Sequence, residues 1–321
     1  MPDMKRVLVI GYSQTGQLND ILDSITGPLK DATNISVDTV TLEPETTYPF
    51  PWPFFRFFDT FPETVYADVP AIKPVQVNPD TDYDLIVLGY QVWFLSPSQP
   101  MTAFLQSELA EQLIKDKPVM TVIGCRNMWL QAQEVMKEHI DRLGGHLVDN
   151  VVLTDSAHAA MTFYSTPIWM VTGNKGPYFG GRIPRAGVPE EDIQAASRFG
   201  EAIAAKLPNR SAEDTTPMLE GLGAVRVNER LIASEKVAKR SFFLWGGLLR
   251  FLGKPGSFLR KIVLVVYFLF LLTLILTVVP LLAIIKKLLT PLTREKVQKQ
   301  KEFFARPSGE ADYRTSTVTS S

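Results

Sequence analysis

Cysteine and histidine are scarce in this chain of 321 residues, which holds one cysteine, Cys125, and three histidines. A single cysteine excludes a disulfide within the chain and agrees with a reducing compartment. His139 falls in a predicted helix and His146 follows two glycines, and neither has neighbours at the spacing of metal ligands. We therefore predict neither a disulfide framework nor a metal site, and we find no internal repeat.

Charge is missing from one long stretch, and its two signs are unevenly divided along the chain. Residues 1–230 have a net charge of −11, whereas residues 231–321 have a net charge of +10. Residues 262–285 carry no formal charge. As a helix they would be about 36 Å long, against about 30 Å for the hydrocarbon core of a bilayer. We therefore predict a membrane helix there. Because basic residues flank both of its ends, a single pass and a re-entrant hairpin bent near Pro280 both stay open.

Apolar runs alternate with helical patterns through the front of the chain. No secretory signal precedes the first run, so we expect this part to stay where it is made. The predicted strands cover residues 6–10, 35–42, 84–89, 119–124 and 147–153, and the predicted helices cover 17–30, 99–115, 129–143 and 190–207. This alternation predicts a three-layer α/β fold with a doubly wound, parallel five-stranded sheet.

The composition changes abruptly after this region and sets the predicted boundaries. We expect an α/β domain over 1–207, a linker over 208–240, an amphipathic interfacial segment over 241–261, the membrane helix over 262–285, and a basic, then disordered tail over 286–321.

A polar turn joins the first predicted strand to the first predicted helix. It lacks the Gly-Lys-Ser/Thr of a Walker loop and the three glycines of the dinucleotide fingerprint. It supplies hydroxyls, amide N–H groups and a small residue where a helix begins, in Ser13, Gln14, Thr15, Gly16 and Gln17. An anion is therefore expected to bind there. The turn resembles the loop with which flavodoxin-like proteins hold the phosphate of FMN, although Leu18 stands where that family usually has another hydroxyl residue.

Two further loops are expected at the same edge, because ligands of a doubly wound sheet bind above the carboxyl ends of its strands. Residues 89–98 resemble the flavin-ring loop of flavodoxin-like reductases and include Gln91, Val92, Trp93 and Phe94. Either Trp93 or Phe94 would contact the ring, unless the aromatic side chain is buried under the next helix. Residues 124–129 occupy the third flavin-contacting position with Cys125, Arg126 and Asn127. Arg126 would place charge near the flavin or substrate, or form a structural ion pair.

Aromatic residues and prolines crowd the segment after the second predicted strand. Residues 48–66 hold nine of the 33 aromatic residues and four prolines, which excludes a regular strand or a long regular helix. The segment would roof the flavin site and receive an apolar substrate tail, dip into a membrane surface, or plug the sheet. A second irregular stretch after residue 153 reaches the same edge. Its His158 and Tyr164 are the best proton-transfer candidates, although a loop histidine such as His158 is more often structural.

A closer resemblance extends over nearly the whole chain. Residues 9–18, 49–54, 90–95 and 125–129, together with the basic-flanked tail, look like those of bacterial dialkylresorcinol condensing enzymes. The resemblance implies dialkylresorcinol biosynthesis with FMN, a lipid-like small-molecule substrate, an unidentified electron acceptor and no nucleic acid. It also implies anchoring at the bacterial inner membrane, with the FMN domain in the cytoplasm.

The chemistry of the residues argues against condensation itself. Condensing acyl thioesters ordinarily needs a nucleophilic cysteine served by histidines, and Cys125 has no histidine nearby in sequence. We therefore expect an oxidoreductase that converts a 2,5-dialkylcyclohexane-1,3-dione to a dialkylresorcinol, with FMN taking the hydride at N5. The alternatives are a membrane-tethered NAD(P)H:quinone reductase and a non-catalytic electron carrier.

Overall fold

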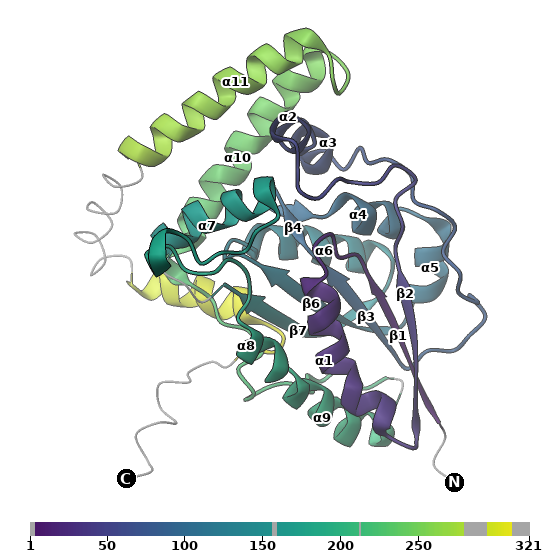
Figure 1. The fold of residues 1–321 in the computed structure, drawn as a ribbon. Helices are drawn as coiled ribbons and strands as arrows, with labels where there is room; N and C mark the ends of the chain where they lie inside the picture. Colours follow the sequence, from purple (N-terminus) through teal and green to yellow (C-terminus); the bar gives the residue numbers. More distant parts are fainter. Residues whose placement is uncertain (1–3, 156–158, 212, 279–293, 310–321) are drawn as a thin grey trace, which may run out of the picture.

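A five-stranded parallel sheet forms the centre of the computed structural model, which describes residues 4–155, 159–211, 213–278 and 294–309 (Figure 1). The strands lie in the order β2-β1-β3-β6-β7, and every neighbouring pair is parallel. Their bounds are β1 (Lys5–Gly11), β2 (Ile35–Thr41), β3 (Leu85–Tyr90), β6 (Pro118–Cys125) and β7 (His146–Thr154). β1, β3 and β6 are buried on both faces, as their continuous apolar runs require. The predicted doubly wound sheet is confirmed.

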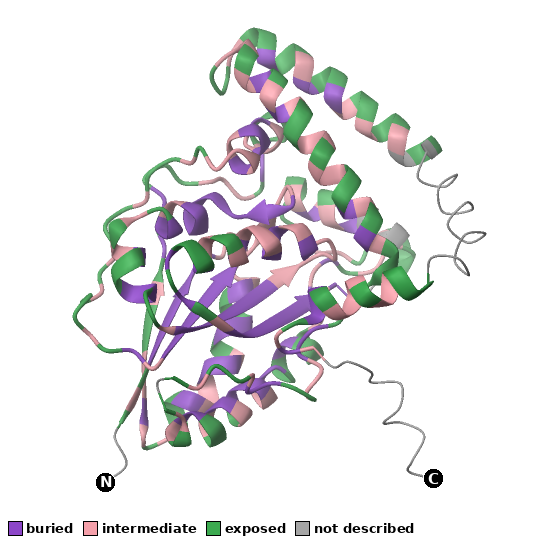
Figure 2. Cartoon of the chain, turned by 180° about the vertical axis from the view of Figure 1, so that it is seen from behind, coloured by how far each residue is buried: buried purple, intermediate pink, exposed green. Residues whose placement is uncertain are grey.

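Helices cover both faces of this sheet (Figure 1). One face carries α1 (Gln17–Asp31), α8 (Glu190–Gln194) and α9 (Ser197–Lys206), and the other carries α4 (Gln99–Leu105), α5 (Glu108–Ile114) and α6 (Leu130–Arg142). Figure 2 shows the strands buried between helices whose outer surfaces are exposed. The helices predicted over 99–115 and 190–207 are each split in two. In the first case Ser107 interrupts the helix, because its hydroxyl accepts from the Ala110 amide at 3.2 Å and caps α5.

The outer edge of β7 is covered by segments from far along the chain. The Val152 amide donates to the Ala224 carbonyl at 2.9 Å, and the Asn150 amide donates to the Ser308 hydroxyl at 2.7 Å. Ser308 in turn donates to the buried carboxylate of Asp149 at 2.7 Å. Residues 294–305, in the basic part of the predicted tail, are helical, and residues 310–321, in its predicted disordered part, lie outside the described residues. The contacts with Ala224 and Ser308 occupy two β7 amides on which another chain could otherwise add a strand.

Two long helices form a separate unit above the sheet in Figure 1. α10 (Glu229–Leu252) and α11 (Phe258–Thr273) pack on the short helices α2 (Phe54–Asp59) and α3 (Phe61–Val65). Four side chains bury a second apolar cluster there: Phe61, Leu249, Leu264 and Tyr267. The short helices α2 and α3 lie within residues 48–66, where the prolines exclude a long regular helix. Residues 229–240 were expected to be part of a linker, but they form the first half of α10.

The membrane helix predicted over residues 262–285 is wrong, and so is the membrane-anchored localisation that rested on it. α11 covers only Phe258–Thr273 and continues into a π-helical turn, Leu274–Val278. Across the part of the chain that the structure describes, no helix combines the length and apolar character needed to cross a membrane. The apolar run has a different use, because Leu264 and Tyr267 pack on Phe61. Residues 279–285 of the prediction lie outside the described residues.

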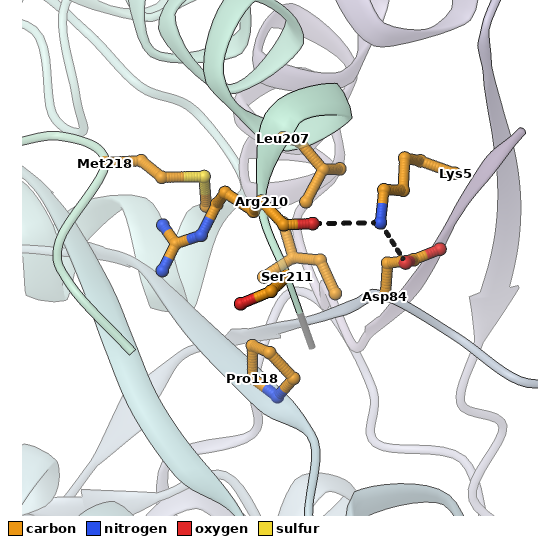
Figure 3. Close-up of a pocket in the computed structure, with 8 residues that line it drawn as sticks. Lys5, Asp84, Pro118, Leu207, Arg210, Ser211 and Met218 are labelled. Carbon is orange, nitrogen blue, oxygen red and sulfur yellow. Dashed lines mark hydrogen bonds and ion pairs between the residues drawn. The ribbon is translucent and has the colours of Figure 1, made fainter. Parts of the chain in front are cut away.

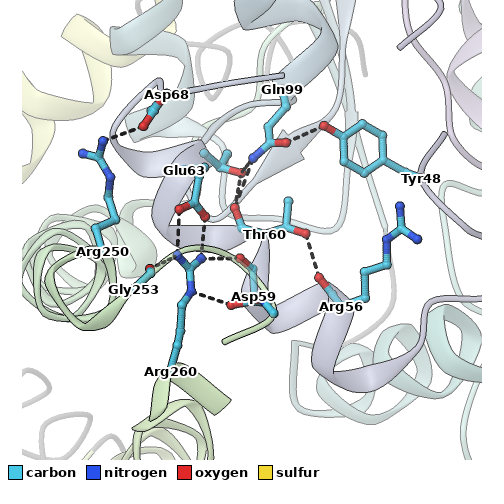
Figure 4. Close-up of polar contacts among 12 residues, drawn as sticks. Tyr48, Arg56, Asp59, Thr60, Glu63, Asp68, Gln99, Arg250, Gly253 and Arg260 are labelled. Carbon is cyan, nitrogen blue, oxygen red and sulfur yellow. Dashed lines mark hydrogen bonds and ion pairs between the residues drawn. The ribbon is translucent and has the colours of Figure 1, made fainter. Parts of the chain in front are cut away.

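A buried charge cluster ties α11 to the short helices (Figure 4). The fully buried guanidinium of Arg260 contacts the Asp59 carboxylate at 2.5 Å and the Glu63 carboxylate at 2.5 and 2.8 Å. It also donates to the Asp59 carbonyl at 2.6 Å, and the second Asp59 oxygen accepts from the Gly256 amide at 2.6 Å. Because the guanidinium is held through several bonds in one plane, only arginine fits this position.

Replacing Arg260 by Met should lower the free energy of unfolding by about 3 to 5 kcal/mol, because it leaves the buried Asp59 carboxylate and the half-buried Glu63 carboxylate without their partner. Arg250→Met is the matched control, since it breaks the more exposed Arg250–Asp68 pair on α10 and should cost about 1 kcal/mol. Equilibrium denaturation in urea measures both. Equal losses for the two variants would show that the Arg260 cluster is not a specific tie.

Candidate functional site

The candidate site lies at the carboxyl edge of the sheet, where the strand order changes direction. β1 has β2 on one side and β3 on the other, and the chain leaves β1 into α1 on one face and β3 into α4 on the other (Figure 1). Such a switch point leaves a crevice between the loops that follow the two strands. The loops after β1, β3 and β6 therefore meet at one edge, as the sequence predicted.

The turn after β1 presents the N-terminal end of α1 to this edge. The Ser13 hydroxyl accepts from the Leu18 amide at 3.2 Å, which fixes the turn on the first turn of the helix. Gly16 has a φ of +85°, and no heavy atom lies within 4 Å of the position that a Cβ would occupy there. Ser13, Thr15 and Gly16 are half-buried, so the turn faces open space while resting on the protein. This is the arrangement in which helix amides bind an anion.

The two glutamines of the turn hold neighbouring segments with their side chains. Gln14 donates to the Pro49 carbonyl at 3.0 Å and accepts from the Trp52 indole at 2.9 Å, and its amide donates to the Gln91 side chain at 3.2 Å. Gln17 donates to the Val188 carbonyl at 3.2 Å and accepts from the Val188 amide at 3.1 Å. The sequence predicts Gln14 and Gln17 as cofactor-binding residues, and in the structure their side chains bond to the segments that border the site.

The position of the Leu18 side chain accounts for the departure from the flavodoxin pattern at this residue. Its side chain is 1 % exposed and lies in the main core beside Gly124. A hydroxyl residue at this position would point into the sheet rather than toward an anion. The sequence alone shows the substitution but not the direction of the side chain.

The loop after β3 is a tight hairpin of β4 (Val92–Trp93) and β5 (Ser96–Pro97). Its two central residues, Phe94 and Leu95, have φ values of 50° and 60°. These values lie in the left-handed region, which residues other than glycine rarely adopt. The Ser98 amide closes the loop by donating to the Gln91 carbonyl at 2.9 Å. A hairpin with this backbone needs support from the surrounding structure.

The hairpin sends its two aromatic side chains in different directions. The Trp93 ring contacts the rings of Tyr12, Tyr48 and Trp52, with centroid distances of 6.0, 4.9 and 5.7 Å. Phe94 packs instead into the second apolar cluster, 5.6 Å from Phe61. Of the two predicted ring contacts, the structure therefore places only Trp93 beside the turn after β1.

The cluster around Trp93 joins the aromatic segment to the sheet. Burial raises the pKa of Tyr12 to about 12 and that of Tyr48 above its ordinary value, so both phenols stay neutral. The Tyr48 hydroxyl donates to the Gln99 side chain, which itself donates to the Thr64 hydroxyl at 2.9 Å (Figure 4). The segment over residues 48–66 thus borders the site as an ordered wall.

The loop after β6 carries an unsatisfied acceptor. The Asn127 side-chain carbonyl oxygen is buried and has no hydrogen-bond partner among the described residues, a rare and costly situation that a bound donor would relieve. Burial lowers the pKa of Arg126, and the nearby Asp155 carboxylate opposes that shift. The Asp155 amide donates to the carbonyls of Cys125 and Arg126 at 3.2 and 3.0 Å, which holds the loop against the end of β7.

The Cys125 thiol is in an environment that suppresses its ionisation. Burial raises the pKa of the thiol, the Glu235 carboxylate raises it further, and the opposing effect of Arg126 is smaller. Because the thiolate is the reactive form of cysteine, this thiol is poorly suited to act as a nucleophile.

Of the two predicted proton-transfer residues, only Tyr164 can be placed. His158 lies outside the described residues. Tyr164 is on α7 (Ala159–Thr172), a helix where the sequence predicted an irregular stretch, and it is 51 % exposed. α7 borders the aromatic wall, because the Trp52 amide donates to the Met170 carbonyl at 2.7 Å and the Phe50 and Trp169 rings lie 5.9 Å apart.

Two charged residues of α10, the buried Glu235 and the half-buried Lys239, also reach the site loops, and sequence reasoning missed both. The Glu235 carboxylate accepts from the Gln131 amide at 3.0 Å at the N-terminal end of α6. The Lys239 ammonium donates to the Leu95 carbonyl at 2.9 Å and to the Ser96 hydroxyl at 2.6 Å. Their four-residue spacing on a helix is visible in the sequence, but the polar composition around them predicts a linker.

Two hollows lie elsewhere on the molecule. One, at the amino edge of the sheet, has a volume of about 10 Å³ and is bordered by Lys5 and Asp84, whose side chains form an ion pair at 2.8 Å (Figure 3). That space suits a water molecule at most. The other is an open groove of about 710 Å³ between α3 and the end of α10, beside the Arg250–Asp68 pair.

The sequence matches no known family model and no curated protein. Among solved structures, an FMN-bound flavoprotein from Lactobacillus acidophilus is 18 % identical with a TM-score of 0.38, covering 46 % of this chain and 93 % of its own. An archaeal flavodoxin is 13 % identical with a TM-score of 0.36, covering 63 % and 98 %. Flavodoxin 1 from Bacillus cereus is 14 % identical with a TM-score of 0.33, covering 64 % and 99 %.

None of these comparisons supports the resemblance to dialkylresorcinol condensing enzymes. The strand order of this chain, β2-β1-β3-β6-β7, is that of the flavodoxin-like arrangement of a doubly wound sheet. On its own topology, the front of the chain is a flavodoxin-like α/β fold.

Proposed function

We propose that this protein binds FMN at the β1/β3 switch point and acts as a flavin-dependent oxidoreductase. The observation that carries the proposal is the hydroxyl-rich turn of residues 13–17, which opens a 15-residue helix at the switch point of a flavodoxin-like sheet. Two local features fit the group. Open space borders Gly16, and the Asn127 oxygen lacks the donor that an N–H of the flavin ring would provide.

Three loops of the chain would each hold a different part of the cofactor. The hydroxyls of Ser13 and Thr15, with the amides at the start of α1, would hold the phosphate. Trp93 would border the ring from the hairpin, and Asn127 would accept a hydrogen bond from it on the other side. When bound, FMN supplies hydride transfer. The segment over residues 48–66 would shield the bound ring from water on this side.

We further propose that the substrate is lipid-like and that the reaction is the oxidation of a 2,5-dialkylcyclohexane-1,3-dione to a dialkylresorcinol. The aromatic wall supports an apolar substrate, because Tyr48, Trp52 and Trp93 present contiguous rings beside the turn. The suppressed ionisation of Cys125 argues against thioester condensation. Of the described residues, Tyr164 is our candidate for the proton-transfer step.

Replacing Ser13 and Thr15 together by Ala should weaken FMN binding at least about tenfold, because two hydroxyl contacts to the phosphate are lost. Ser24→Ala is the control, since it removes a hydroxyl from α1 two turns beyond the site. Isothermal calorimetry with FMN measures all three proteins. A wild type that shows no flavin absorbance and takes up no added FMN would contradict the proposal.

Cys125→Ala should keep most of the activity that converts a synthetic dialkylcyclohexanedione to a dialkylresorcinol in the presence of an electron acceptor, because the thiol takes no part in hydride transfer. Product formation followed by chromatography tests this. Acyl thioesters alone should give no carbon–carbon condensation. Condensation by the wild type that disappears in Cys125→Ala would show that the cysteine is the catalyst.

A further inference from the structure

Resting on the proposed function, we infer that Glu235 and Lys239 of α10 are positioning residues that fix the two loops meant to flank the flavin ring. α10 lies outside the three layers of the α/β fold and packs on α3 and α6. It nevertheless reaches the hairpin after β3 and the turn after β6. The geometry of these two contacts gives α10 a role that neither the strand order nor the phosphate turn assigns to it.

Lys239 secures the tip of the hairpin. Its ammonium group bonds to the Leu95 carbonyl and the Ser96 hydroxyl, directly at the two residues that follow the positive-φ position of Phe94. Burial lowers the pKa of Lys239 to about 8, and the nearby Glu138 carboxylate opposes that shift. A cation placed at the carbonyl of a left-handed residue stabilises a backbone that would otherwise relax. Relaxation there would move Trp93, the neighbouring residue on β4.

Glu235 secures the other loop. Its carboxylate is fully buried and sits at the N-terminal end of α6, where one oxygen accepts from the Gln131 amide. Its second oxygen is buried and finds no hydrogen-bond partner in the part of the chain that the structure describes. Gln131 is four residues beyond Asn127, so this bond ties α10 to the end of the turn that carries Asn127. An acceptor at a helix N-terminus orients that helix and the loop leading into it.

The contacts of α10 with the site share one helical face. Glu235 and Lys239 are four residues apart, and Phe242 follows three residues later, with its ring 5.8 Å from that of Phe94. This spacing places the three side chains along one stripe of α10. The helix therefore contacts the loops after β3 and β6 as one rigid element.

Protonation of Glu235 makes the stability of the protein depend on pH. Burial raises the pKa of Glu235 from an ordinary value of 4.5 to about 7, and the amides at the start of α6 oppose this shift. The titratable groups that face it are Cys125 and Tyr90, whose pKa values are both raised above their ordinary values, and Lys239 lies one turn along α10. Of Glu235, Cys125 and Tyr90, only Glu235 titrates between pH 5 and 7.

The first experiment measures hydrogen–deuterium exchange in the full-length protein without added FMN. Lys239→Met should accelerate exchange in residues 91–98 about tenfold, because the hairpin loses its support, and should leave the amides of β1 and β3 unchanged. Lys239→Arg should restore slow exchange, since it keeps a cationic donor. Arg240→Met, an exposed charge one residue along, is the matched control and should match the wild type. Unchanged exchange in Lys239→Met would overturn the role of Lys239.

The second experiment compares the Tm of the wild type and Glu235→Gln from pH 5 to pH 8. Because the folded state raises the pKa of this acid, its protonated form contributes stability that is present near pH 4.5 and is lost as the pH rises to about 7. The wild type should therefore lose stability relative to Glu235→Gln across that window and stay parallel to it above. Glu229→Gln, an exposed glutamate on the same helix, should keep the wild-type slope. A constant offset between wild type and Glu235→Gln at every pH would overturn the role of Glu235.

FMN affinity then separates this inference from the proposed function. In calorimetry, Lys239→Met should bind FMN about tenfold more weakly than the wild type, with Arg240→Met unchanged. A wild type that binds FMN and a Lys239→Met variant that binds it equally well would overturn the positioning role and leave the proposed function standing. If the wild type binds no FMN but exchange is still accelerated in Lys239→Met, the proposed function is overturned. The stabilisation of the hairpin by α10 is then still supported.

Discussion

Parallel pairing of the five strands is the constraint on which the rest of the molecule depends. Because all strands run the same way, every loop that follows a strand emerges at one edge, and residues 12–17, 91–98 and 125–129 meet there although they are far apart in sequence. The switch in direction beside β1 then leaves the turn of α1 facing a crevice. The amides of that helix and the hydroxyls of Ser13 and Thr15 are the features that make the crevice suited to a phosphate.

The second apolar cluster extends this edge beyond the usual three layers. α2 and α3 arise from the proline-rich segment, and α10 and α11 pack on them through Phe61, Leu249, Leu264 and Tyr267. Arg260 fixes that packing with a buried charge cluster, which restricts how the helices dock more than apolar contact does. Since Phe94 belongs to the same cluster, the position of the hairpin is coupled to the helical unit above it. The site is therefore shaped from outside the sheet as well as from within it.

The sequence was sufficient for the sheet and its edge, because buried parallel strands are continuous apolar runs and the turn chemistry of residues 13–17 is local. Prediction from the sequence failed where one local pattern is typical of two different structures. The uncharged run after Lys261 is equally typical of a membrane helix and of a helix packed on aromatic neighbours. The two are separated by the length of α11 and by the packing of Leu264 and Tyr267 on Phe61, neither of which can be seen in the sequence. Glu235 and Lys239 were missed because their partners are backbone atoms more than a hundred residues away. Likewise, the sequence cannot show that Trp93 and Phe94 point in different directions.

The central claim is that the phosphate turn at the switch point anchors the flavin, and comparing the affinities of FMN and riboflavin tests it most directly. Both molecules carry the same ring, so the difference between their dissociation constants measures the contribution of the phosphate. Calorimetry on the full-length protein should show FMN binding at least about tenfold more tightly than riboflavin, with the gap narrowing as salt screens the phosphate charge. Equal affinities for the two, or no binding of either, would contradict the account.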